Sequence, residues 1–188
     1  SEAIVNEYQT LQDFEGFKLE IIRFLSVDCP VEESEFKSLK SEELTTMIYQ
    51  NAITNYKTKS EVISQKTYPV IKDVYENQST TYQNIVIPFT DGLKTLQVVT
   101  NLKEAFESEG GNIPLSIEKG VSLAIIDESW KENLRELDDL KQSVQNATYE
   151  QKDPLLIYKF ESFNLFKQMI EKINKDIVSF LMKANLPE

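Results

Sequence analysis

The only cysteine, Cys29, is the one candidate for a thiolate nucleophile. A reactive cysteine needs a basic partner that lowers its pKa, and histidine, the usual partner, is absent from the sequence. Cys29 stands directly before Pro30 with no basic residue nearby in sequence. It is therefore better interpreted as a small packed side chain. A single cysteine also excludes an internal disulfide and a multi-cysteine zinc site within these 188 residues.

Carboxylates gather in the second half of the chain, where they could in principle bind a hard cation such as Mg²⁺. The clearest group is Glu128, Glu136, Asp138 and Asp139. Acidic residues on a long helix more often form a solvated face, paired with Lys or Arg one turn away. A metal-dependent hydrolase built on these carboxylates is therefore the least favoured interpretation, and the expectation for this chain is no metal.

No phosphate-binding loop is present, because none of the five glycines is followed by lysine. We therefore expect no catalytic residues, no bound nucleotide and no other cofactor in this chain. The 20 basic and 31 acidic residues give a net charge of −11, which argues against nucleic acid as a partner. No apolar run reaches the roughly 18 residues of a membrane span. The chain lacks a secretory signal and an initiator Met, so it reads as a piece of something longer.

The first half of the sequence predicts short helices around one small hairpin. Apolar residues recur at helical spacing, and Asp28 to Pro30 ends one such segment. Ser41 is expected to cap the next helix, and a further helix is expected from about Ser60 to Tyr75 with a kink at Pro69. Strands are expected on either side of Thr90, Asp91 and Gly92, spanning residues 84–89 and 93–99. A short helix capped by Asn101 should then end at Gly110 and Gly111.

The second half predicts two long antiparallel helices joined by a short loop. One apolar stripe runs from Val121 to Val144 and includes Trp130, which we expect to be an anchor between the two helices. Asp153 and Pro154 give the cap and first turn of the second helix. Helices of about 30 residues would each be about 45 Å long. The expected fold is mostly α, with a minor β-hairpin and a long two-helix hairpin.

The loop between the long helices carries a tyrosine, Tyr149, where a core cannot easily cover it. Small polar residues would suffice for a linker, and aromatic residues at projecting positions often contact partners. The residues alone leave two interpretations open. Tyr149 either contacts a partner or packs back against another part of the protein.

Several blocks of the second half together resemble the SecA family, the ATP-driven motor subunits of bacterial preprotein translocases. They are LAIIDESWKENLRELDDLKQ from Leu123 to Gln142, the run from Tyr149 to Pro154, and the residues around Tyr158 and Ser162. Residues 13–112 resemble the helical wing of the family less closely. The hairpin around Asp91 resembles the wings of Bacteroidetes-type members.

The resemblance implies three regions: residues 1–12 end a scaffold helix, residues 13–112 form the helical wing, and residues 113–188 form the helical scaffold with its two-helix finger. In the family the finger tip contacts the moving polypeptide at the mouth of a membrane channel. The matching residues here are Tyr149, Gln151 and Lys152. The residues just before the tip, Val144 to Thr148, depart from the family's usual Ile-His-Leu-Arg-Gly run.

The resemblance also implies properties of a longer parent protein. ATP and Mg²⁺ would bind to motor domains of the same chain, and many members carry zinc in a C-terminal tail. The partners would be a preprotein substrate and the protein-conducting channel, and the location would be cytoplasmic and peripheral to the inner membrane. The alternative from another class is a stand-alone helical interaction or adaptor module, which a two-helix hairpin alone would permit.

Overall fold

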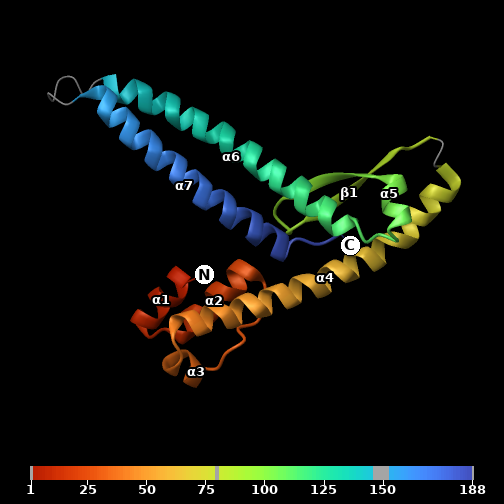
Figure 1. Cartoon of the computed structure of the whole chain (residues 1–188), viewed down its shortest axis with the longest axis horizontal. Helices are drawn as coiled ribbons and strands as arrows, with labels where there is room; N and C mark the ends of the chain where they lie inside the picture. Colours follow the sequence, from red (N-terminus) through yellow and green to blue (C-terminus); the bar gives the residue numbers. More distant parts are fainter. Residues whose placement is uncertain (1, 79–80, 146–152, 188) are drawn as a thin grey trace.

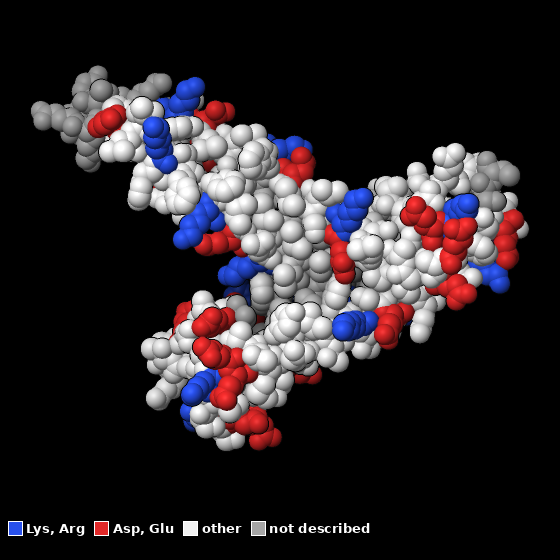
Figure 2. All heavy atoms as spheres, viewed as in Figure 1, with Lys and Arg blue, Asp and Glu red and all other residues white. Residues whose placement is uncertain are grey.

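The computed structural model describes residues 2–78, 81–145 and 153–187. Helices α1 (Glu2–Leu11), α2 (Phe14–Leu25) and α3 (Glu33–Ser38) pack as a small lobe on the first half of α4 (Ser41–Gln78), as Figure 1 shows. The core of this lobe consists of buried apolar side chains from all four helices and from the segment between α2 and α3: Val5, Phe17, Ile21, Val27, Val31, Phe36, Leu44 and Ile48. This lobe is acidic on the face seen in Figure 2.

Helix α4 is a single 38-residue helix, so the expectation of a separate helix starting near Ser60 is wrong. Neither glycine nor proline interrupts residues 41–68, and the hydroxyls of Thr54 and Thr58 bond to the carbonyls one turn before them. The hydroxyls of Thr54 and Thr58 therefore have hydrogen-bond partners inside the helix. The helix also continues through Pro69.

The start of α4 differs in detail from the expectation. The Glu43 carboxylate accepts a hydrogen bond from the Lys40 amide at 3.0 Å, and the Leu44 amide donates to the Lys40 carbonyl at 3.1 Å. Lys40 is therefore the capping residue. The Ser41 hydroxyl, which we expected to cap the helix, has no hydrogen-bond partner among the described residues.

The predicted β-hairpin is confirmed as β1 (Asn84–Thr90) and β2 (Thr95–Asn101), paired antiparallel with Ile87 opposite Val98. The second strand begins two residues later than expected, because the Asp91 carboxylate accepts from the amides of Leu93 (3.0 Å) and Lys94 (2.7 Å). Gly92 has a φ of +89°, which a residue with a side chain rarely adopts. The hairpin therefore turns where the sequence indicates.

Helix α5 (Leu102–Glu107) is capped as predicted, with the Asn101 side chain accepting from the Glu104 amide at 3.1 Å. Gly110, at φ +81°, follows it and leads into α6 (Ile113–Gln145). Helix α7 (Pro154–Lys183) begins at the predicted cap, where Asp153 accepts from the Leu155 amide at 2.9 Å. Figure 1 shows α6 and α7 side by side as the predicted long hairpin.

A second core lies where the second half of α4, the β-hairpin and α5 meet the starting half of α6 and the end of α7. Its buried members are Ile63, Ile71, Ile87, Phe89, Val98, Leu102, Ala105, Ile113, Ile117, Val121, Ile125, Phe180 and Ala184. After α7 the chain pairs with the edge of β1, because Asn185 donates to the Thr90 carbonyl at 2.7 Å and accepts from its amide at 2.9 Å. One end of the long hairpin is thus embedded in this core.

Within the described ranges, no helix is long and apolar enough to cross a membrane.

Candidate functional site

The long hairpin formed by α6 and α7, here called the finger, has two distinct parts. Its base, residues 113–128 and 173–183, contributes to the second core, whereas its outer half, residues 129–145 and 154–172, projects away from the rest of the molecule (Figure 1). The expected contact residues Tyr149, Gln151 and Lys152 lie outside the described residues, so their role stays a prediction.

The buried side of α6 differs from the sequence-based expectation. Ser129 and Asn133 are 8% and 3% exposed, and they continue the four-residue series of buried Ile117, Val121 and Ile125. No partner for the Asn133 side-chain nitrogen is found among the described residues. The four-residue spacing from Ile117 to Asn133 is the sequence signal for the buried side of α6. The apolar stripe through Trp130 and Leu134 is more conspicuous in the sequence, and it favoured a different side.

Trp130 is 47% exposed, so it is not a core residue. Its ring meets that of Phe166 edge-on, with the centroids 6.5 Å apart, which joins α6 to α7. An interhelical contact is therefore present, but it lies at the surface and not in the core. The sequence could not reveal this, because two apolar stripes compete on α6.

The outer half of the finger exposes many large apolar side chains. On α7, Leu156, Phe160 and Phe163 are each about two-thirds exposed. Trp130 and Leu134 on α6 are about half exposed. Exposed apolar surface of this kind is typical of sites that contact another molecule. The outer half can therefore bind apolar groups without any change in the core of the protein.

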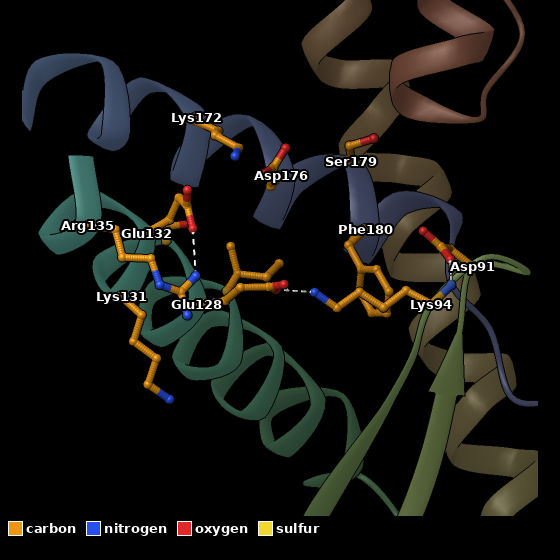
Figure 3. Close-up of a pocket in the computed structure, with 12 residues that line it drawn as sticks. Asp91, Lys94, Glu128, Lys131, Glu132, Arg135, Lys172, Asp176, Ser179 and Phe180 are labelled. Carbon is orange, nitrogen blue, oxygen red and sulfur yellow. Dashed lines mark hydrogen bonds and ion pairs between the residues drawn. The ribbon is translucent and has the colours of Figure 1, made fainter. Parts of the chain in front are cut away.

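A cleft of about 660 Å³ lies at the base of the finger, beside the turn of the β-hairpin (Figure 3). Ile125 and Phe180 supply its apolar lining, and its charged side chains come from α6, α7 and the turn. They are four cations and four carboxylates: Lys94, Lys131, Arg135, Lys172, Asp91, Glu128, Glu132 and Asp176. The opposite charges balance, so the cleft carries no net charge.

Lys94 and Glu128 form an ion pair across this cleft (Figure 3). The other seven ion pairs among the described residues join positions three or four apart on one helix, whereas this pair joins the turn after β1 to α6. The Lys94 ammonium, through its hydrogen bond and its charge, lowers the pKa of Glu128. The pair therefore links the β-hairpin to the finger.

The cysteine and the carboxylates considered from the sequence lie in different parts of the fold. The described residues contain no group of three or more His, Cys, Asp or Glu side chains that could hold a metal ion. Of the carboxylates considered above, Glu128 is paired, while Glu136, Asp138 and Asp139 are exposed on α6. Cys29 is half-buried in the first lobe, and this burial raises the pKa of its thiol, which disfavours a nucleophilic thiolate.

Two contacts fix the base of the finger to α4. The Tyr56 hydroxyl donates to the Glu118 carboxylate of α6 at 2.9 Å, and burial together with this bond raises the pKa of Tyr56. The Lys59 ammonium donates to the carbonyls of Leu181 and Met182, at 2.8 and 2.9 Å, near the end of α7. A cation at a helix C-terminus is favourable, because the last carbonyls carry partial negative charge. The base is therefore held from two sides.

Two comparisons with known proteins, by family model and by relatives, agree on one family. Residues 1–185 match the family model described as the SecA wing and scaffold domain. A protein translocase subunit SecA from Christiangramia forsetii is 48% identical over the whole of this chain, and one from Bacteroides fragilis is 51% identical over 93% of it. A SecA from Parabacteroides distasonis is 49% identical over 95%. No solved structure matches the chain.

The chain spans only 16–17% of the length of these relatives. Each of them is a translocase subunit by name, which favours the SecA interpretation over the stand-alone adaptor module. The Bacteroides and Parabacteroides relatives also agree with the Bacteroidetes-type resemblance.

Proposed function

The chain belongs to the SecA wing and scaffold family, and on this premise we propose that it forms the scaffold and the polypeptide-contacting finger of a protein translocase subunit. The division proposed from the sequence assigns residues 1–12 to the end of a scaffold helix, 13–112 to the wing and 113–188 to the scaffold and finger. The chain itself performs no ATP hydrolysis. In the longer protein, motor domains bind ATP and Mg²⁺ and drive the finger.

The observation that carries this proposal is the contrast along the finger. Its base shares a core with α4, α5 and the β-hairpin, while the outer halves of its 33- and 30-residue helices project from the rest of the molecule. Two helices packed side by side bend less than one, so a displacement applied at the base reaches the tip. A projecting arm with an anchored base is suited to pushing another molecule.

The substrate proposed for the tip is an unfolded preprotein, and the partner proposed around it is a membrane channel. The proposed contact residues are Tyr149, Gln151 and Lys152. A phenol ring suits this task because its flat apolar face packs on many different side chains while its hydroxyl tolerates water. The longer protein would work at the cytoplasmic face of the inner membrane, and a zinc-binding tail would lie outside this chain.

The test separates transport from folding. In the full-length translocase, Tyr149→Ala should lower preprotein transport into vesicles, and Tyr149→Phe should retain more of it. In the 188-residue chain, Tyr149→Ala should shift the melting temperature by no more than about 1–2 °C, as expected for an exposed position. Tyr82→Ala, at a tyrosine that is 51% exposed beside the β-hairpin, is the matched control and should leave transport unchanged.

An outcome in which Tyr149→Ala clearly destabilises the chain while the folded variant transports normally would contradict the proposal. It would show that Tyr149 packs against its own protein, which is the alternative that the sequence leaves open.

A further inference from the structure

A pocket of about 430 Å³ lies where the end of α2, the middle of α4 and the end of α7 meet. Its charged lining consists of Lys59, Lys66 and Lys183, and no carboxylate lines it. We call it the lysine pocket. It lies apart from the finger tip and from the charged cleft at the finger base, with which it shares no lining residue.

The absence of carboxylates from the lining is unexpected in this chain. The sequence has 31 acidic and 20 basic residues, and the cleft at the finger base balances its four cations with four carboxylates. None of the three pocket lysines belongs to an ion pair in the described ranges. Desolvation opposes the charge of Asp91, but backbone hydrogen bonds at Lys94 and Leu93, with a smaller contribution from the charge of Lys183, lower its pKa overall; Asp91 lines the other cleft. The lysine pocket is thus a local concentration of positive charge.

Lys59 is held in place before any ligand arrives. Two of its N–H groups donate to the carbonyls of Leu181 and Met182, and its ammonium lies 5.5 Å from the centre of the Phe89 ring. The third N–H group is left for a ligand. Burial lowers the pKa of Lys59 to about 8, so a nearby anion would offset the cost of keeping the ammonium charged.

Polar groups that can donate hydrogen bonds complete the lining. Ser26, the left-handed residue that ends α2, contributes a hydroxyl, and Asn185, just after α7, contributes a side-chain amide. The amide oxygen of Asn185 accepts from the Leu186 amide, so its NH₂ group remains as a donor. Both residues are exposed, which leaves the pocket open to solvent.

We propose that the lysine pocket binds a phosphate group, either as a free phosphate or as the headgroup of an anionic lipid. Three separate ammonium groups match a dianion with several oxygens better than a single carboxylate, whose planar pair of oxygens is matched by the fork of an arginine. The pocket contains no arginine. The site joins the first lobe, α4 and the end of the finger, so a bound phosphate would bridge all three.

The test is a titration of the 188-residue chain with inorganic phosphate at constant ionic strength, followed by amide NMR shifts. Saturable shifts should localise to Ser26, Thr58 and Asn185. Lys66→Gln and Lys183→Gln should each weaken phosphate binding by about threefold, the effect expected of one exposed charge. Lys57→Gln is the matched control, because Lys57 is an exposed lysine of α4 outside the pocket.

Two further measurements distinguish the sources of the phosphate. Sedimentation with phosphatidylglycerol vesicles that is weakened by Lys66→Gln but not by Lys57→Gln assigns the site to a lipid headgroup. Saturable phosphate binding without vesicle binding assigns it to a soluble phosphate. Either result supports the proposal.

Three results would overturn the proposal: shifts that stay linear up to millimolar phosphate, equal losses in Lys57→Gln and Lys66→Gln, or an acidic peptide that binds where phosphate does not. These results do not depend on the finger tip, so the phosphate site can fail while the proposed translocase function stands, and the reverse.

Discussion

The base and the outer half of the finger are parts of the same two helices, yet the outer half buries the polar Ser129 and Asn133 beside the apolar Val144 and Met169. At the base, the buried side of α6 carries Ile113, Ile117, Val121 and Ile125. In the outer half the same side continues with Ser129 and Asn133. The helices are continuous across the change, so the difference lies in packing and not in secondary structure.

This contrast indicates how one element combines anchoring with contact. Apolar burial fixes the base, because each large side chain removed from water stabilises the fold. The outer half instead leaves large apolar side chains such as Phe160 and Phe163 exposed and buries the Asn133 amide, whose nitrogen has no partner among the described residues. Substitutions in the two parts should therefore differ in both size and sign.

The largest effect is expected in the second core, which the base of the finger shares with β1. Phe89 is 1% exposed, packs against Phe180 and lies under the Lys59 ammonium, so Phe89→Ala should lower the free energy of unfolding by about 3–5 kcal/mol. Chemical denaturation measures this change. Val86→Ala on the same strand is the control, because Val86 is 55% exposed and its loss should cost little. Equal losses of stability in Phe89→Ala and Val86→Ala would mean that the side of β1 that carries Phe89 does not anchor the strand in the core.

The second-largest loss of stability is expected at Trp130, where the outer half of the finger begins. About half of the Trp130 surface is covered, so Trp130→Ala should lower the free energy of unfolding by about 2 kcal/mol. Removing a fully buried aromatic side chain would lower it by roughly 3–5 kcal/mol. Trp130→Phe should recover part of the loss by keeping the edge contact with Phe166. A cost as large as that of Phe89→Ala would place the indole in a core and would remove the contrast between the two parts.

The third effect should have the opposite sign. Asn133→Leu removes a buried amide whose nitrogen has no partner among the described residues and adds apolar surface, so it should stabilise the chain by about 1 kcal/mol. Asn133→Asp is the matched control and should destabilise it, because it buries a charge. A loss of stability in Asn133→Leu would show that the amide is satisfied by a water molecule or by a partner.

The smallest effect concerns the ion pair that links the hairpin turn to the finger. A double-mutant cycle on Lys94→Gln and Glu128→Gln should give a coupling of about 0.2–1 kcal/mol, since both side chains are largely exposed. Lys94 lowers the pKa of Glu128, so this coupling is present at neutral pH and is lost as the pH falls through that lowered pKa, below the ordinary glutamate value of about 4.3. The i,i+4 pair of Asp127 and Lys131 provides a local comparison. No coupling at neutral pH would leave the turn and the finger joined by apolar packing alone.

The local features of the fold could be predicted from the sequence because each depends on a few adjacent residues. Asn101 and Asp153 cap their helices, and Asp91 with Gly92 turns the hairpin, through bonds within four residues. The features that were missed depend on distant partners. The continuity of α4 past Ser60 depends on packing at both ends, and the side of α6 that faces inward depends on where α7 lies.

The same distinction applies to the candidate sites. The finger could be located from helical periodicity, whereas the role of Tyr149 between the two periodic segments stays a prediction. The ion pair of Lys94 and Glu128 joins residues 34 positions apart, and the lysine pocket draws on α4, α7 and the segment that follows α2. No local pattern encodes either arrangement, so only the folded chain brings these residues together.

Helix α4 also determines how the chain unfolds. It contributes Leu44 and Ile48 to one core and Ile63 and Ile71 to the other, and its backbone runs through both without a break. Melting either core would leave half of α4 without tertiary support, and an isolated helix of that length is only marginally stable in water. The two lobes are therefore coupled in unfolding although their cores share no side chain. In folding terms they form one cooperative unit, with α4 as the element through which the loss of either core weakens the other.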